Sequence, residues 1–234
     1  MNIVEFHNVS KAFKKQEVLR DINIEIENNE IVGLIGPSGS GKTTIIKTLV
    51  GTYPPTKGEV KIFDTVVPNF ATLKRLGYMS QDNALYKNLN GYQNLAFFMS
   101  MYTKVDKNYI YDLAKLVDLE NDMNKLVENY SGGMKKRLSL IVSLVSNPEL
   151  LILDEPTVGI DPLLRYKIWD FFYELKKQGK TLLVSTHVMD EAMRCDRLLL
   201  IREGKIIASG KPNELLEKYQ VENIEEIFLI KEDN

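Results

Sequence analysis

The stretch Gly36-Pro37-Ser38-Gly39-Ser40-Gly41-Lys42-Thr43 follows directly on the apolar run Ile31–Ile35. It fits the pattern G-x-x-x-x-G-K-[ST], in which a glycine-rich loop joins a buried strand to a helix and wraps its backbone N–H groups around phosphates. The positive end of the helix, which we expect to begin near Lys42, faces the same anion. In this pattern the lysine reaches the β- and γ-phosphates and the threonine hydroxyl ligates Mg²⁺. The stretch, continued through Thr44, therefore predicts a site for ATP or a similar nucleoside triphosphate with Mg²⁺.

Composition limits the functions open to this chain of 234 residues. The formal net charge of −2 lacks the basic excess of nucleic-acid-binding proteins, so no nucleic-acid partner is expected. Cys195 is the only cysteine, which excludes an internal disulfide and a multi-cysteine zinc site. The N-terminus lacks the basic and apolar regions of a signal peptide, and no apolar stretch approaches the ~20 residues of a transmembrane helix. We expect a soluble chain whose membrane role comes through a partner.

Apolar patterning predicts strands around the glycine-rich loop. Residues 2–9 and 17–27 form two expected strands, with Phe13 between them. Isoleucine alternates with polar residues from Ile22 to Ile26, which is the period of a half-buried antiparallel pair. Further strands are expected near 59–64 and 75–80.

A region with helical patterning, at about residues 84–147, interrupts these expected strands. It contains a capping box at Asn90 and Gln93 and a second helix over Tyr109–Leu119. We expect one α/β domain over residues 1–234. Its parts are a P-loop core with a mostly parallel sheet, an antiparallel β subdomain at the N-terminus, the inserted α-helical subdomain, and a short helical extension at about 221–234.

A second glycine-rich helix start lies at Ser131-Gly132-Gly133. Ser131 suits an N-cap, and apolar residues at helical spacing follow it. Two glycines in a first helical turn cost stability, unless bare backbone N–H groups must approach a ligand closely. We favour an anion-binding helix start over an ordinary Ser-Gly-Gly turn, because a long helix follows at once.

Two carboxylates end a fully apolar run at Leu150–Glu155. Such a run predicts a strand buried on both faces of a parallel sheet, and ligands bind at the carboxyl ends of such strands. Asp154 suits Mg²⁺, and Glu155 suits a general base for an attacking water. Asp161 and Pro162 then read as the N-cap and first residue of another helix.

Three further residues are weak candidates when each is taken alone. Phe13 could stack on an adenine, but loop packing explains an aromatic there equally well. Gln81 follows a strand and reads as a solvated loop residue. His187 follows the apolar strand Thr181–Thr186, at the same edge as Asp154, although a lone histidine is usually structural.

In order and spacing, these residues resemble the ATP-binding subunit of an ABC transporter over nearly the whole chain. Gly36–Thr43 is similar to the Walker A motif, Leu150–Asp154 to the Walker B strand, and Ser131–Lys135 to the family signature, usually Leu-Ser-Gly-Gly-Gln. The remaining matches are Glu155 as catalytic glutamate, Gln81 in the glutamine loop, Gly159-Ile160-Asp161 as D-loop, His187 as switch histidine and Phe13 as adenine-stacking aromatic.

The departures from this pattern point to one branch of the family. Tyr130 replaces the leucine of the signature and Met134 replaces its glutamine. The sequence Lys-Lys-Arg follows directly after Met134. The methionine after Ser-Gly-Gly, followed by Lys-Lys-Arg, resembles the subunits of bacterial exporters of drugs and antimicrobial peptides, as does the ending Asn223–Leu229. Val158 stands before Gly159 where serine is common.

The resemblance implies an ATPase that works as a head-to-tail dimer, with a second copy of the chain as its partner. The P-loop of one protomer would hold ATP, with Lys42 in a catalytic role, and Ser131 of the other would close on the γ-phosphate. Glu155 and His187 would position the attacking water. Gln81 would contact Mg²⁺ and the γ-phosphate, and Asp161 of the D-loop would also lie at the nucleotide.

The same resemblance implies a separate integral membrane permease, and hence a peripheral location on the cytoplasmic face of the cell membrane. Export of a drug, peptide or lipid-like substrate is the expected task, with an importer subunit as the nearest alternative. A soluble ABC ATPase acting on DNA or ribosomes is disfavoured. Only 87 residues (131 − 43 − 1) separate Thr43 from Ser131, without sustained heptads, and one cassette is present. A non-hydrolysing regulator would lack Glu155.

Overall fold

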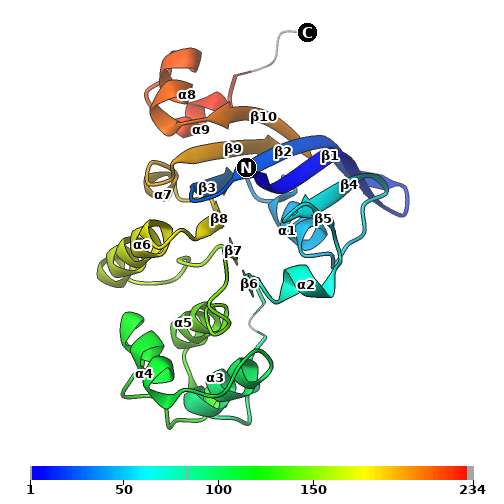
Figure 1. Ribbon diagram of the computed structural model, residues 1–234. Helices are drawn as coiled ribbons and strands as arrows, with labels where there is room; N and C mark the ends of the chain where they lie inside the picture. The colour runs from blue at the N-terminus through cyan, green and yellow to red at the C-terminus, as the bar shows by residue number, and fades with distance from the viewer. Residues whose placement is uncertain (1, 83, 231–234) are drawn as a thin grey trace. The chain divides into compact units, whose positions relative to one another are not determined.

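The computed structural model describes residues 2–82 and 84–230 and divides them into two compact units (Figure 1). The first unit comprises the described residues up to Thr72 and those from Leu183 onward. The second comprises Leu73–Leu182, apart from the residue outside the described ranges. Each unit carries part of the expected site.

An antiparallel sheet opens the first unit, with the strand order β2-β1-β4-β5. The strands are β1 (Asn2–Phe13), β2 (Gln16–Glu27), β4 (Lys57–Ile62) and β5 (Thr65–Val66). Val4 lies opposite Ile26 and Phe6 opposite Ile24, so the alternating apolar residues share one buried face. The expected bounds of the first strand were wrong. β1 continues to Phe13, which pairs with Gln16 across a tight turn, because ladder pairing extends a strand beyond its apolar residues.

Parallel strands form the other sheet of this unit. Fully buried β3 (Ile31–Ile35) pairs with β9 (Arg197–Arg202) in parallel, and β9 forms an antiparallel hairpin with β10 (Lys205–Gly210). β8 (Thr181–Thr186), most of which belongs to this unit, follows β3 in the strand order. The helices of the first unit are α1 (Lys42–Leu49), α2 (Phe70–Leu73, at its junction), α7 (Met189–Ala192), α8 (Pro212–Tyr219) and α9 (Ile224–Ile227).

The second unit combines two parallel strands with a group of helices. β6 (Leu76–Met79) pairs with β7 (Leu150–Asp154), and residue 76 lies opposite residue 150. The helices are α3 (Gly91–Ser100), α4 (Lys107–Leu116), the 3₁₀ turn η1 (Val127–Asn129), α5 (Gly132–Val142) and α6 (Pro162–Lys177). α3 packs on both α4 and α5, and the three gather in one part of the unit (Figure 1).

Local capping explains where these helices begin. Asn90 and Gln93 form the expected capping box, and Ser131 and Asp161 cap α5 and α6 as expected. The expected start of α4 at Tyr109 was wrong. Asp106 accepts hydrogen bonds from the backbone N–H groups of residues 108 and 109, so the helix begins two residues earlier, at Lys107.

The observed architecture confirms the α/β class, with an antiparallel N-terminal sheet and a mostly parallel second sheet. Within residues 2–82 and 84–230, no helix has the length and apolar character needed to cross a membrane.

Candidate functional site

The glycine-rich loop leaves the end of β3 and enters α1 in the first unit. Gly39 and Gly41 have φ values of 79° and 115°, which favour glycine. A Cβ on Gly36 would stand 2.3 Å from the carbonyl oxygen of Ile201, so this backbone passes directly against β9. The backbone N–H of Gly204 also donates to the Ser40 carbonyl (2.9 Å). The loop conformation therefore depends on its glycines.

Polar groups in this loop suit a bound anion. The ammonium of Lys42, a buried side chain, lies over the loop and donates to the carbonyls of Gly36 (2.7 Å) and Pro37 (3.1 Å). Among the described residues, the buried Ser40 hydroxyl has no hydrogen-bond partner. Such a group is uncommon in proteins and fits a ligand oxygen. The first turn of α1 contains no acidic side chain, so its N–H groups face no repelling charge.

Phe13 is a partly exposed aromatic, with 39% of its surface accessible. Its ring packs edge-on against Tyr53, with 5.0 Å between ring centroids, and the Lys11 ammonium lies 5.0 Å from the Phe13 centroid. An aromatic face with neighbouring cations suits a nucleotide base and its phosphates. Sequence reasoning missed Tyr53, which lies 40 positions away in a turn-rich segment.

His187 follows β8 and is exposed. Two neighbours hold its backbone: the Thr186 hydroxyl donates to the Glu191 carboxylate (2.8 Å) and accepts from the N–H of Val188 (3.0 Å). The Glu191 side chain is 1% exposed, which makes this bond a buried one. Sequence reasoning missed both Thr186 and Glu191, because only the turn into α7 brings them together.

In the second unit, Asp154 is the last residue of β7 and Glu155 follows it. Residues 150–153 are completely buried and Asp154 is 1% exposed, so the strand places one carboxylate inside the unit. Glu155 has a φ of 54°, in the left-handed region that a glutamate rarely adopts. Backbone strain of this kind costs about 1–3 kcal/mol and clusters at functional sites. This left-handed conformation turns the chain away from β7 at Glu155, the expected general base.

The helix start at Ser131 is open to solvent. The Ser131 hydroxyl accepts from the N–H of Met134 (3.2 Å), so this side chain acts as the N-cap. Within the part of the chain that the structure describes, a Cβ on Gly132 would meet no atom within 4 Å. Among the described residues, a Cβ on Gly133 would meet only the Gly159 carbonyl, at 3.6 Å. The packing of this unit therefore does not require either glycine.

Gln81 and Asp161 are also exposed in this unit. Gln81 follows β6, and the Asp161 carboxylate accepts from the N–H of Leu164 (3.0 Å). The expected residues thus fall into two sets. The first unit holds Phe13, Gly36–Thr44 and His187. The second holds Gln81, Ser131–Gly133, Asp154, Glu155 and Asp161.

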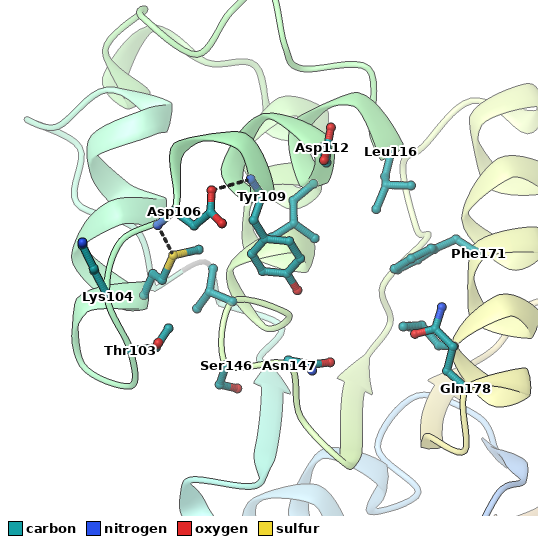
Figure 2. A pocket seen from close by; sticks show the side chains of 14 residues that line it. Thr103, Lys104, Asp106, Tyr109, Asp112, Leu116, Ser146, Asn147, Phe171 and Gln178 are labelled. Carbon is teal, nitrogen blue, oxygen red and sulfur yellow. Dashed lines mark hydrogen bonds between the residues drawn. The ribbon is translucent and has the colours of Figure 1, made fainter.

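A cavity of about 710 Å³ lies in the second unit, between the end of α3, α4, the end of α5 and α6 (Figure 2). None of the expected site residues lines it. Tyr109 donates its hydroxyl to the Leu144 carbonyl. Asp106, the N-cap of α4, accepts a hydrogen bond from the backbone N–H of Tyr109 at the wall of this cavity (Figure 2). With Asp112 also at the wall, two carboxylates face one lysine, Lys104, so the cavity does not suit a triphosphate.

The buried strand, glycine-rich loop and following helix together define a P-loop nucleotide-binding domain. A model of the ABC transporter family matches residues 19–158, more than half of the sequence. The chain belongs to the ABC transporter family and corresponds to its ATP-binding domain. The resemblance found in the sequence is thereby confirmed.

Named relatives and solved structures agree with this assignment. Nod factor export ATP-binding protein I of Burkholderia lata is 38% identical over 92% of this chain and 72% of its own length. ABC transporter G family member 20 of Dictyostelium discoideum is 38% identical over 99% of this chain, but the chain spans only 33% of that relative.

Two solved structures match closely. An ATP-binding subunit of an ABC transporter gives a TM-score of 0.88 at 25% identity, covering 97% of this chain and 98% of that one. A dimeric ATP-binding cassette in a post-hydrolysis state, bound to ADP and Pi, gives a TM-score of 0.82 at 26% identity. The match covers 89% of this chain and 98% of that one.

Proposed function

We propose that the chain is the ATP-hydrolysing motor subunit of an ABC transporter that exports its substrate. The observation that carries the proposal is the P-loop itself. Its glycines are required by the conformation, Lys42 lies over it, and the Ser40 hydroxyl lacks a partner among the described residues. These features suit a bound triphosphate, with Phe13 stacking on the adenine.

Hydrolysis would depend on Glu155, His187 and Lys42. Glu155 accepts the proton of the attacking water, and its left-handed backbone at the end of β7 is the kind of strain found at functional sites. His187, whose backbone is held through Thr186 and Glu191, orients the same water or the γ-phosphate. Lys42 offsets the charge of the phosphates as a point cation.

Mg²⁺ fits the available oxygen atoms. Within the described residues no three His, Cys, Asp or Glu side chains cluster as a metal site, so the ion would rely on mixed ligands. The Thr43 hydroxyl, Asp154 and Gln81 supply them, together with phosphate oxygens, which is the kind of shell that Mg²⁺ accepts. When bound, the ion neutralises charge on the phosphate oxygens.

A second copy of the chain completes the site in this proposal. The start of α5 is exposed, and Gly132 and Gly133 leave its N–H groups accessible. An open helix start without acidic side chains suits the γ-phosphate of ATP held by the partner. The dimeric ATP-binding cassette among the similar structures supports this arrangement.

Export through a separate membrane permease is the proposed task. The relative named for Nod factor export supports the direction of transport, and Met134 of the signature, followed by Lys-Lys-Arg, resembles the branch that exports drugs and peptides. The substrate class is accordingly a drug, peptide or lipid-like molecule. The motor subunit would lie on the cytoplasmic face of the membrane, bound to the permease.

Glu155→Gln tests the enzymatic proposal. Removing a positioned base lowers rates by ~10²–10⁴-fold, whereas ATP binding should persist because the P-loop is untouched. Steady-state phosphate release by the purified variant is the measurement, and ATP should trap a dimer visible by size exclusion.

Glu149→Gln is the matched control. It removes a carboxylate at the opposite end of β7, where Glu149 forms an exposed ion pair with Arg75. This variant should keep its turnover. Near-wild-type phosphate release by Glu155→Gln would remove Glu155 from the role of base.

A further inference from the structure

The start of α3 and the segment before α5 form one hydrogen-bonded body in the second unit. The N–H of Tyr92 donates to the carbonyl of Met123 (3.0 Å). In the same way, the N–H of Val127 donates to the carbonyl of Leu89 (3.0 Å). Tyr130, the next buried side chain along, leads directly into the N-cap of α5. The first turn of α3 and the helix start at Ser131 are therefore structural neighbours.

The Tyr130 side chain makes the connection. It is 3% exposed, and its hydroxyl donates to the carbonyl of Asp122 (2.8 Å). Burial, with a smaller contribution from the negative charge of Asp122, raises the pKa of Tyr130 to about 12. The phenol consequently remains a hydrogen-bond donor throughout the working pH range.

Gly91 provides the space for this hydroxyl. A Cβ on Gly91, the first residue of α3, would stand 2.4 Å from Tyr130 Oη and 3.2 Å from Met123 Sδ. The backbone of Gly91 does not lie in the left-handed region, so an alanine could adopt the same conformation. Space rather than dihedral angle requires the glycine here. Gly91 and Tyr130 are a matched pair, 39 residues apart.

We propose that Tyr130 is a positioning residue for the helix start at Ser131, held by the hydrogen bond from its hydroxyl to the Asp122 carbonyl in the space that Gly91 leaves at the first turn of α3. The leucine more usual before this serine has no hydroxyl and cannot make the bond to Asp122. Because α3 begins ten residues after Gln81, the pair joins the segment after Gln81 to the helix start that would contact ATP. The functional part of this inference rests on the proposed function.

Four proteins test the pair: wild type, Tyr130→Phe, Gly91→Ala and the double variant. Phenylalanine lacks the hydroxyl oxygen that the new Cβ at position 91 would strike, so the double variant should regain much of the urea-unfolding midpoint that Gly91→Ala loses. Such a rescue is non-additive, as expected for residues in contact. If Gly91→Ala alone does not fold, recovery of a folded double variant is the expected rescue. Additive losses, or a double variant that also fails to fold, would overturn the pairing.

Turnover separates positioning from stability. Tyr130→Phe should lower kcat about fivefold, the factor that one ordinary hydrogen bond represents, while KM for ATP stays unchanged because the P-loop lies in the other unit. Tyr109→Phe is the matched control, since Tyr109 is also partly buried and donates its hydroxyl to a backbone carbonyl of the same unit, that of Leu144. It should lose stability without losing kcat.

Equal kcat for the two phenylalanine variants would overturn the positioning role, even if the unfolding data confirm the pair. If the wild type itself hydrolyses no ATP, the proposed function fails. The unfolding experiment then still decides whether Gly91 and Tyr130 are paired.

Discussion

The molecule has two glycine-rich helix starts, and they use glycine for different reasons. At the P-loop, Gly36 is pressed against the carbonyl of Ile201, and Gly39 and Gly41 have positive φ. At the start of α5, a Cβ on Gly132 would meet no atom of the described residues, although glycine weakens a helix. The first loop needs glycine to fold. The second keeps room for something outside its own unit, which supports a ligand presented by a second copy.

The largest expected effect is on the P-loop side. Gly36→Ala forces a Cβ against a backbone carbonyl that cannot move freely, so the free energy of unfolding should fall by about 3 kcal/mol. The ATP-induced rise in melting temperature should disappear with it, because the loop loses its shape. Urea unfolding and thermal shifts with and without ATP measure both.

Gly39→Ala serves as the control for that experiment. Its Cβ would meet no atom within 4 Å in the described structure, so only the positive φ is penalised, at about 1 kcal/mol. Equal losses for the two variants would contradict the assignment of a steric role to Gly36.

A smaller effect of opposite sign is expected on the α5 side. Gly132→Ala should raise the free energy of unfolding by about 0.5 kcal/mol, because alanine favours a helix and meets no neighbour. Turnover should nevertheless fall at least about tenfold, since the methyl group occupies the approach to the N–H groups. Chemical unfolding measures the change in the free energy of unfolding, and phosphate release by the same preparation measures the change in turnover.

Ser131→Ala provides a reference for the stability change of Gly132→Ala. It removes the N-cap bond to Met134 and should cost about 1 kcal/mol. If Gly132→Ala kept full turnover, the space at this helix start would have no role in the reaction.

The smallest effect is expected at the Arg75–Glu149 ion pair, away from both helix starts. Its two hydrogen bonds are 2.6 and 2.7 Å long, but the side chains are 45% and 52% exposed, so solvent screens the pair. Glu149→Gln should cost about 0.5 kcal/mol or less at pH 7. ATP binding should not change.

The difference in the free energy of unfolding between wild type and Glu149→Gln should depend on pH in a known direction. The hydrogen bond from Arg75 lowers the pKa of Glu149 below its ordinary value in the folded state. The contribution of the ion pair to the free energy of unfolding is therefore present above the ordinary glutamate pKa. It is lost as the pH falls through the lowered pKa of Glu149. Unfolding curves of wild type and Glu149→Gln should converge in acid. A difference that grows toward low pH would contradict the assignment.

The sequence predicted those features that depend on neighbours a few residues apart. Ser131, Asp161 and the Asn90–Gln93 box cap their helices as expected, because each bond joins residues three apart. The alternating isoleucines likewise predicted the buried face of β2.

Features that depend on distant contacts were not predictable in this way. Tyr53 meets Phe13 across 40 positions, and Gly91 leaves space for Tyr130 across 39. The left-handed backbone of Glu155 has no signature in residue type, since the surrounding fold imposes it. The motif spacing predicts which residues form the site, but it does not predict how each one is held.

The most direct test of the central claim is the ATP affinity of the isolated monomer of Gly132→Asp, with Lys42→Ala measured beside it. An aspartate in the first turn favours a helix and meets no neighbour here, so the variant should fold. We expect an ATP Kd within about twofold of wild type for Gly132→Asp, with turnover lost, because its carboxylate repels only a phosphate presented by the partner. Lys42→Ala should bind ATP weakly in the same assay. Loss of ATP binding by the Gly132→Asp monomer would show that this helix start contacts nucleotide within its own chain, and would rule out a role for it at the partner's ATP.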